Sequence, residues 1–251
     1  MSRARSARRP DRCRTLVTGG SGEIGAAICR ALAADGHHVL VHAGRGLERA
    51  ESVVEAIRAE DGSAEPVQFD LADGEATRSA VTQLVDAAPL GAVVHNAGIH
   101  DDAPMAGMSP AQWQRVIDVN LGGFYNVVQP ALLGMARLRW GRVVAVSSVA
   151  ARIGNRGQVN YAAAKAGMHG AVASLAREMA SRGLSANVIA PGVIDTGMLG
   201  ELDREGLLAA IPAGRFGSPE DVATLAAFLC SDKAGYINGQ VIGVDGGMAP
   251  N

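Results

Sequence analysis

The chain has 251 residues, of which 48% are hydrophobic and 19% charged, and this suits one large α/β domain and argues against global disorder. Its formal net charge of −2 argues against a nucleic-acid-binding protein. The sequence has no run of about 18 apolar residues, so we expect no membrane span.

The first fourteen residues are basic, with arginine at six positions and Asp11 as the only acid. We expect residues 1–13 to form a disordered basic tail and residues 14–251 to form a single domain. No apolar stretch follows the arginines, so a secretory signal is not indicated. The three cysteines are far apart, which is typical of reduced thiols and predicts a cytoplasmic location. The six histidines lack the spacing of metal ligands, so we expect structural roles for them and no metal site.

Strands and helices alternate along the rest of the chain. Strands are predicted at residues 14–18, 38–42, 65–69, 91–95, 142–146, 186–190 and 240–244. Helices are predicted at about residues 24–34, 47–59, 74–87, 124–137, 159–181 and 219–229. Such alternation implies parallel strands joined by right-handed crossovers. We therefore predict one doubly wound parallel sheet of the Rossmann type, with about seven strands and helices on both faces.

A glycine-rich loop, Thr18–Gly25, joins the first predicted strand to the first predicted helix. In a doubly wound sheet this turn binds the pyrophosphate of a dinucleotide. Glycines let the backbone approach the phosphates, and the helix N-terminus supplies unpaired N–H groups. Glycines are also common in ordinary tight turns, so the prediction depends on the position of the loop rather than on its composition.

The end of the second predicted strand indicates which dinucleotide binds. An acidic residue there would bind a free ribose 2′-hydroxyl, but this segment has no carboxylate and carries Arg45 instead. A guanidinium can pair with a 2′-phosphate through two hydrogen bonds. We therefore predict NADPH as the preferred cofactor and keep NADH as the alternative, in which Arg45 is a solvated loop residue.

Ser148, Tyr161 and Lys165 form a candidate proton donor. A phenol keeps its proton to about pH 10, and a nearby cation lowers that pKa. Positions i and i+4 share a helix face, so Lys165 can reach the neighbourhood of Tyr161. A serine hydroxyl can hold a carbonyl oxygen while it is being reduced. The pair could equally be two exposed helix residues, so the interpretation requires a source of hydride elsewhere in the chain.

Six motifs in order complete the pattern. They are the glycine loop, His95-Asn96-Ala97-Gly98, Asn120 in Val119-Asn120-Leu121, Ser148, Tyr161-x-x-x-Lys165 and Pro191–Thr196. With them the chain resembles the short-chain dehydrogenase/reductase family from about Thr15 to Met248. It is most similar to the 3-oxoacyl-[acyl-carrier-protein] reductases, through the stretch Gly154–Tyr161 and the ending Val244–Met248. The stretch before Gly167 also resembles carrier-protein reductases of aryl-polyene or polyketide clusters.

The resemblance implies a catalytic role for four residues. Tyr161 would protonate the substrate oxygen, and Lys165 would lower the pKa of Tyr161 and bind the nicotinamide ribose. Ser148 would orient the carbonyl. Asn120 would hold a water that continues the proton relay towards Lys165.

The resemblance also implies a set of cofactor contacts. Asn96 and Gly98 would line the adenosine side, and Asp70 would meet the adenine edge. Val193 and Thr196 would contact the nicotinamide carboxamide. The full set is Gly19, Ser21, Gly22, Ile24, Gly25, Arg45, Asp70, Asn96, Gly98, Tyr161, Lys165, Pro191, Val193 and Thr196.

The glycine loop departs from the family at two positions. Glu23 replaces the middle glycine of Thr-Gly-x-x-x-Gly-x-Gly, and Gly22 stands where a basic residue is usual. A carboxylate pointing inward would repel a pyrophosphate. The departure concerns cofactor affinity and NADPH preference, whereas the catalytic set is complete.

The resemblance suggests partners as well as a reaction. An acidic acyl carrier protein would need a basic rim near the active-site mouth, and Arg139 and Arg182 match carrier-docking arginines of the reductase branch. Apolar residues after Thr196 are typical of a substrate lid or of ordinary helix packing; they are Met198, Leu199, Leu202, Leu207, Leu208 and Ile211. The long helices from Gly122 and Val159 would form dimer surfaces, and the C-terminal strand would complete a homotetramer.

Three hypotheses about function follow. The first is NADPH-dependent reduction of a carrier-bound 3-oxoacyl thioester to the 3-hydroxyacyl product, in fatty acid or polyketide biosynthesis. The second is an NAD-dependent alcohol or sugar dehydrogenase, which the missing base at Gly22 favours. The third is a non-catalytic cofactor-binding sensor or scaffold, which Glu23 favours.

Overall fold

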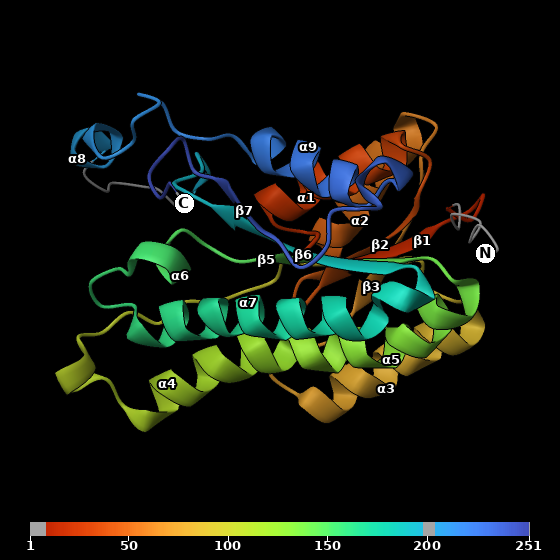
Figure 1. The fold of residues 1–251 in the computed structure, drawn as a ribbon, viewed down its shortest axis with the longest axis horizontal. Helices are drawn as coiled ribbons and strands as arrows, with labels where there is room; N and C mark the ends of the chain where they lie inside the picture. The colour runs from red at the N-terminus through yellow and green to blue at the C-terminus, as the bar shows by residue number, and fades with distance from the viewer. Residues whose placement is uncertain (1–8, 198–203, 251) are drawn as a thin grey trace.

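The described residues form a single parallel sheet between two layers of helices. The computed structural model describes residues 9–197 and 204–250. Its seven strands pair in the order β3-β2-β1-β4-β5-β6-β7, all parallel. Helices α1, α2 and α9 cover one face, and α3, α5 and α7 cover the other (Figure 1). The predicted fold class, single parallel sheet and strand number are confirmed.

The bounds of the elements are close to those predicted. The strands are β1 Arg14–Thr18, β2 His38–Ala43, β3 Ser63–Gln68, β4 Ala92–His95, β5 Gly141–Val146, β6 Leu184–Pro191 and β7 Val241–Val244. The helices are α1 Glu23–Ala34, α2 Leu47–Ala59, α3 Gly74–Ala87, α4 Pro110–Ile117, α5 Gly123–Leu138, α6 Ala150–Ile153, α7 Val159–Met179, α8 Arg204–Ala209 and α9 Pro219–Leu229.

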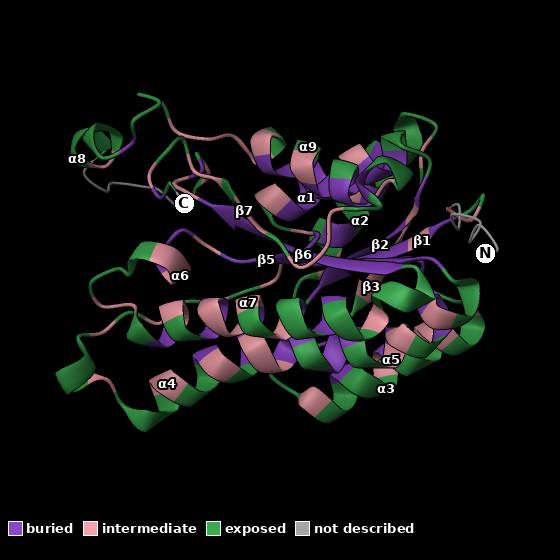
Figure 2. Cartoon of the chain, viewed as in Figure 1, coloured by how far each residue is buried: buried purple, intermediate pink, exposed green. Residues whose placement is uncertain are grey.

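The sheet is buried because helices cover both of its faces (Figure 2). β5 and β6 are buried along their whole length, and the edge strands β3 and β7 are only partly buried. Valine, leucine and isoleucine are frequent in the inner strands, as expected of a parallel sheet covered on both faces. Their side chains divide into two apolar clusters, one on each face of the sheet. Pro66 is tolerated in β3 because an edge strand does not need every N–H group.

The strand order reverses between β1 and β4. β1 leads to α1 on one face, and β4 leads through α4 and α5 to the other face. The loops after the carboxyl ends of β1 and β4 therefore separate and leave a crevice, where ligands bind in open α/β sheets. The glycine loop follows β1, and the segment from Asn96 follows β4, so the motifs of the sequence meet at this crevice.

The region between β4 and α5 differs from the prediction, which placed no element there before residue 124. Ser109 caps α4 through a capping box with Gln112. A π-helical turn, Asp118–Gly122, then joins α4 to α5 in one continuous helical path. Asn120 lies in this turn, and turns of this kind are common at functional sites.

The described residues begin before the predicted domain boundary at residue 14. The backbone N–H of Arg9 donates to Asp232 at 3.0 Å, and Cys13 is buried. Residues 1–8 of the expected tail lie outside the described residues. The three cysteines are free and buried, and burial raises the pKa of Cys13 to about 11. Within the described part of the chain, no helix has the length and apolar character that a membrane crossing requires.

Candidate active site

A cleft of about 730 Å³ opens at the crevice and brings most of the predicted site residues together. That volume suits a drug-sized or cofactor-sized ligand. The predicted residues that line it are Gly19, Ser21, Gly22, Ile24, Gly25, Asn96, Gly98, Ser148, Tyr161, Lys165, Pro191, Val193 and Thr196. Arg45, Asp70 and Asn120 are not among its lining residues.

The glycine loop is packed so closely that two of its glycines are required. Gly19 has φ +64°, and a Cβ on it would lie 2.9 Å from the Cα of Ala97. A Cβ on Gly25 would lie 2.0 Å from the carbonyl oxygen of Gly19. The amide of Asn96 donates to the carbonyl oxygens of Thr18 and Gly19, each at 3.2 Å. Asn96 therefore holds the loop from the side of β4.

His42 holds the same loop from the side of β2. Its Nε2 donates to the carbonyl of Phe69 at 2.8 Å, which leaves Nδ1 to accept from the N–H of Gly19 at 3.1 Å. Burial lowers the pKa of His42 to about 4, so this neutral tautomer persists at neutral pH.

His95 joins the glycine loop to the π-helical turn that carries Asn120. Its Nε2 donates to the carbonyl of Asn120 at 3.1 Å, and its Nδ1 accepts from the hydroxyl of Thr18 at 3.2 Å. The Thr18 oxygen in turn accepts from the N–H groups of Asn96 and Ala97. Burial lowers the pKa of His95 to about 3. The sequence did not reveal the roles of His42 and His95, because histidines without metal spacing have no distinctive pattern.

The Glu23 carboxylate bonds to the segment after β6 rather than to the glycine loop. Its Oε1 accepts a hydrogen bond from the N–H of Gly197 at 2.8 Å. Gly22 precedes it as the N-cap of α1 and provides no side-chain cap. A Cβ built on Gly22 would make ordinary contact with the Gly19 carbonyl oxygen at 3.5 Å, and Gly22 lines the cleft without a side chain.

Ser148 and Tyr161 are joined by a side-chain hydrogen bond. The Ser148 hydroxyl oxygen also accepts from the N–H of Ala150 at 3.2 Å, at the start of α6. Burial raises the pKa of Tyr161, nearby Asp102 adds to this rise, and the bond to Ser148 opposes it. The structure thus keeps Tyr161 protonated at neutral pH, as a proton donor must be.

Lys165 lies one turn after Tyr161 on α7 and is 2% exposed. Its Nζ donates to the carbonyl of Val146 at 2.9 Å and lies 5.7 Å from the centroid of the Tyr161 ring. Burial lowers the pKa of Lys165 to about 8. The cation is therefore near the phenol as predicted, but burial rather than the cation dominates the pKa of Tyr161 in this structure.

Asn120 is fully buried behind Gly98. Its Nδ2 donates to the carbonyls of Ile99 and Val116, each at 2.8 Å, whereas its Oδ1 has no hydrogen-bond partner among the described residues. A Cβ on Gly98 would lie 2.5 Å from that oxygen and 2.9 Å from the Nζ of Lys165. Gly98 therefore leaves a small polar space between the two side chains, which suits a bound water.

The ends of β2 and β3, beside the cleft, carry exposed charged side chains. Arg45 follows β2, Asp70 follows β3, and their side chains form an ion pair at 3.8 Å. The Arg45 side chain is 91% exposed, so the pair contributes little to stability. Arg49, four residues further on in α2, lines the cleft but was not predicted. A search of the first helical turn after the predicted ribose-binding residue would have found it.

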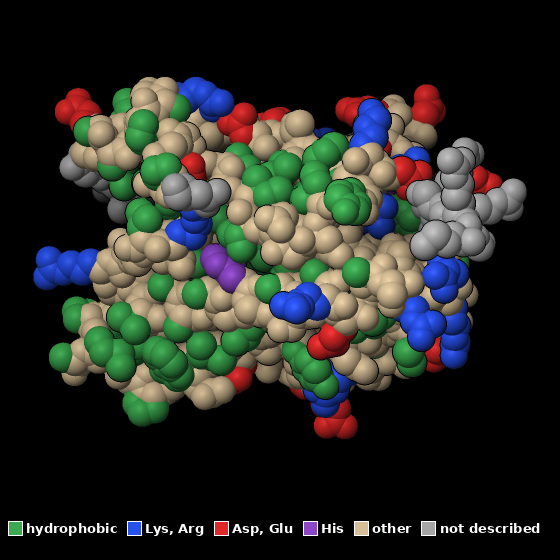
Figure 3. Space-filling model, in the orientation of Figure 1, with side chains coloured by type: hydrophobic (Ala, Val, Ile, Leu, Met, Phe, Trp, Pro, Cys, Tyr) green, Lys and Arg blue, Asp and Glu red, His purple; other side chains and the backbone are tan. Residues whose placement is uncertain are grey.

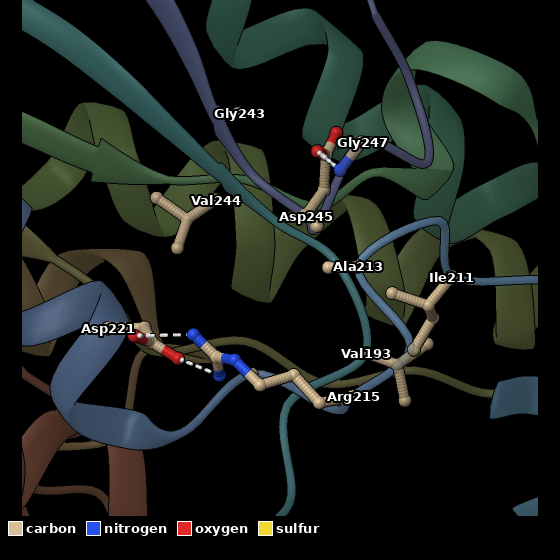
Figure 4. A pocket seen from close by; sticks show the side chains of 11 residues that line it. Val193, Ile211, Ala213, Arg215, Asp221, Gly243, Val244, Asp245 and Gly247 are labelled. Atoms are coloured by element: carbon tan, nitrogen blue, oxygen red, sulfur yellow. Dashed lines mark hydrogen bonds and ion pairs between the residues drawn. The ribbon is translucent and has the colours of Figure 1, made fainter.

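The segment Val193–Gly197 forms the wall opposite the glycine loop. The Val193 carbonyl accepts from the N–H of Gly217 at 3.0 Å, and the N–H of Asp195 donates to the carbonyl of Gly217 at 2.7 Å. A second cavity of about 320 Å³ lies behind Val193 (Figure 4). Arg215 and Asp221 form an ion pair at 2.8 Å beside it.

The two predicted docking arginines lie away from the cleft. Arg139 ends α5 just before β5, and Arg182 lies just before β6. They are close together, because Arg139 donates to the carbonyl of Ser181 at 3.2 Å. They stand at the amino ends of strands whose carboxyl ends form the cleft, so within one chain they do not border its mouth as expected. A six-residue strand such as β5 spans roughly 20 Å.

The remaining predictions concern the expected lid and metal binding. Met198, Leu199 and Leu202 of the expected lid lie outside the described residues. Leu207 and Leu208 lie in α8, and Ile211 lines the second cavity. Within residues 9–197 and 204–250, no group of three or more His, Cys, Asp or Glu side chains could hold a metal ion.

Fold and site together define a dinucleotide-binding reductase of the short-chain dehydrogenase/reductase class: a glycine loop after β1 faces a serine, a tyrosine and a lysine across one cleft. A family model described as enoyl-(acyl carrier protein) reductase matches residues 20–249. The chain belongs to this family within the short-chain dehydrogenases/reductases.

Known proteins resemble the chain over almost its whole length. It is 43% identical over 236 residues to a 3-oxoacyl-[acyl-carrier-protein] reductase of Aggregatibacter actinomycetemcomitans, an alignment covering 93% of this chain and 98% of that protein. The structure of an Agrobacterium tumefaciens 3-oxoacyl (acyl-carrier-protein) reductase with NADP bound matches with a TM-score of 0.89 and 32% identity, covering 94% of this chain and 95% of that one. A putative NAD(P)-dependent gluconate 5-dehydrogenase of Beutenbergia cavernae with bound NADP matches with a TM-score of 0.90 and 37% identity, covering 94% and 96%.

Proposed function

We propose that the protein is an NADPH-dependent oxidoreductase that reduces a 3-oxoacyl thioester carried by an acyl carrier protein to the 3-hydroxyacyl product. The observation that carries this proposal is the single cleft that joins the glycine loop to Ser148, Tyr161 and Lys165. The 43% identity to a 3-oxoacyl-[acyl-carrier-protein] reductase supports the substrate class. Relatives with bound NADP support the cofactor.

The residues on the walls of the cleft fit a dinucleotide. The close approach of Gly19 to Ala97 excludes a side chain at that point of the loop, and the first residues of α1 line the cleft, where the unpaired N–H groups of a helix start can bind an anion. Arg45 and Arg49 would bind the 2′-phosphate, with Asp70 at the adenine edge. Gly19, Ser21, Gly22, Ile24, Gly25, Asn96, Gly98, Pro191, Val193 and Thr196 would hold the rest. A bound NADPH would supply hydride to the substrate carbonyl.

The protein residues supply the proton. Ser148 donates a hydrogen bond to the substrate oxygen, and the Tyr161 hydroxyl gives that oxygen its proton as the carbonyl becomes an alcohol. The Lys165 ammonium stabilises the phenolate that remains. The unpartnered Oδ1 of Asn120 accepts from a water that passes a proton back towards Lys165.

The assembly of the protein into an oligomer would determine which cleft a docked carrier protein can reach. Hydrophobic side chains gather over α4 and the nearby end of α7 (Figure 3), and Tyr125, Leu133 and Val159 are exposed on α5 and α7. We infer a homodimer or homotetramer that covers such surfaces. Because Arg139 and Arg182 lie at the amino ends of β5 and β6, opposite the ends that form the cleft, a carrier protein docked on them would reach the cleft of a neighbouring subunit. The protein would act in the cytoplasm, as one domain over residues 14–251.

The test is turnover of a carrier-bound substrate. Purified protein should oxidise NADPH in the presence of acetoacetyl-carrier protein or acetoacetyl-coenzyme A. Tyr161→Phe removes the proton donor and should lower kcat by a factor of about 10² to 10⁴ while NADPH still binds. Undiminished turnover in this variant would contradict the mechanism.

A second candidate is a sugar-acid dehydrogenase, which the match to the putative gluconate 5-dehydrogenase supports. Gluconate oxidation with NADP or NAD, compared with acetoacetyl-carrier protein reduction under matched conditions, separates the two. A higher kcat/KM for gluconate would replace the first proposal.

A further inference from the structure

Glu23 connects the two walls of the cleft. It is the first residue of α1, on the glycine-loop side, and its carboxylate reaches Gly197 at the end of the opposite wall. The acceptor oxygen lies 2.8 Å from the Gly197 nitrogen, a distance normal for a hydrogen bond to a carboxylate. Glu23 and Thr196, the neighbour of Gly197, both line the cleft. The bond therefore joins two segments that line the same cleft.

The opposite wall is attached at two places. Val193 and Asp195 bond to the backbone of Gly217, beside the second cavity in Figure 4. These bonds hold the start of the segment beside the start of α9. The Glu23 bond holds its end, at Gly197, towards α1.

We propose that Glu23 is a positioning residue that clasps the Val193–Gly197 segment against α1 and so slows cofactor release. This inference rests on the proposed use of NADPH. The carboxylate is engaged by the Gly197 N–H group rather than by the glycine loop, and the neighbouring Gly22 lines the cleft without a side chain. The replacement of glycine by glutamate then strengthens closure of the cleft rather than repelling the cofactor.

The alternative is that the Glu23 carboxylate only repels the cofactor phosphates. The two hypotheses predict opposite effects on NADPH binding when the carboxylate is removed. A carboxylate that only repels phosphate would slow association and weaken binding, so its removal would tighten binding. A clasp acts after binding, so its removal would speed dissociation and leave association unchanged.

The experiment compares Glu23→Ala with Glu23→Gln by stopped-flow and equilibrium NADPH fluorescence. Glu23→Ala should raise the dissociation rate constant about three- to tenfold, the loss expected for one exposed hydrogen bond. Glu23→Gln keeps an acceptor oxygen and should stay within about threefold of the wild type. Glu75→Ala is the matched control, because Glu75 is an exposed first-turn glutamate of α3, and it should change nothing.

The possible outcomes test the clasp and the proposed function separately. Faster association and tighter binding in both Glu23 variants would overturn the clasp in favour of repulsion. An unchanged dissociation rate in Glu23→Ala, with a wild type that binds NADPH, would overturn the clasp alone. A wild type that binds neither NADPH nor NADH would contradict the proposed function and the clasp together.

Discussion

The site has a proposed catalytic end, around Asn120 and Lys165, and a proposed adenosine end, around Arg45 and Asp70, and the two are built in different ways. At the proposed catalytic end, Asn120 and Lys165 are almost completely buried, and each donates to a backbone carbonyl. At the proposed adenosine end, the Arg45 and Asp70 side chains are 91% and 49% exposed and form one long ion pair.

The difference indicates where the chain tolerates change. A buried polar group is costly to leave unpaired, so the catalytic end accepts few substitutions. An exposed ion pair contributes little to stability, so the residues around Arg45 and Asp70 can be substituted at little cost to the fold. The departures from the family pattern, Gly22 and Glu23, lie on the glycine-loop side of the cleft and not among the catalytic residues.

The largest effect should come from Lys165→Met, at the catalytic end. The ammonium would be lost from the proton pathway, and kcat should fall by a factor of about 10² to 10⁴. Stability at pH 7 should change little, because removing a charge that burial penalises offsets the loss of the hydrogen bond to the Val146 carbonyl. In the wild type, kcat/KM for reduction should decline above pH 8 as the ammonium deprotonates. Kinetics and thermal unfolding check both expectations, and a profile flat to pH 10 would refute the role of the cation.

The second-largest effect should be a loss of protein stability in acid, caused by three buried histidines that contact β1 or the glycine loop. Burial lowers the pKa to about 4 for His37 and His42 and to about 3 for His95. Below pH 6.5 these histidines become protonated in the unfolded chain but stay neutral in the native state. They therefore leave the free energy of unfolding unchanged above pH 6.5 and lower it as the pH falls towards 4. Each histidine contributes up to about 1.4 kcal/mol per pH unit.

Urea unfolding between pH 7.5 and 4.5 measures this slope. His95→Asn removes one of the three groups and should make the slope shallower. An equal slope in the variant would mean that His95 does not stay neutral in the folded protein.

The smallest effects belong to the adenosine end. Arg45→Ala and Arg49→Ala should each raise the Kd for NADPH about three- to tenfold and leave the Kd for NADH nearly unchanged, since only NADPH carries the 2′-phosphate. Arg30→Ala is the control, because Arg30 is an exposed arginine of α1 that pairs with Glu220 at 3.9 Å. Equal losses for both cofactors would instead indicate a general effect of charge.

The sequence predicted the regular elements well and the long-range contacts poorly. The bounds of α2, α3 and α9 agree with the prediction, because apolar periodicity and capping residues are local signals. The role of His95 depends on β1 pairing with β4, where Thr18 stands opposite His95. The direction of Glu23 depends on Gly197, which is 174 residues away. The distance of Arg139 and Arg182 from the cleft could have been inferred, since both precede predicted strands whose carboxyl ends carry the site.

The π-helical turn at Asp118–Gly122 constrains how many residues can separate α4 from α5, and it also places Asn120. An i→i+5 turn holds one residue more than a regular helical path between α4 and α5. Deleting one residue there would return the path to a regular α-helix and leave the face of α4 that packs on α7 in place, but it would remove the wide turn that places Asn120. Adding one residue would instead rotate α4 by about 100° relative to α5, since a helix turns once in 3.6 residues. Either change within Asp118–Gly122 should therefore be as damaging as substitution of Asn120 itself.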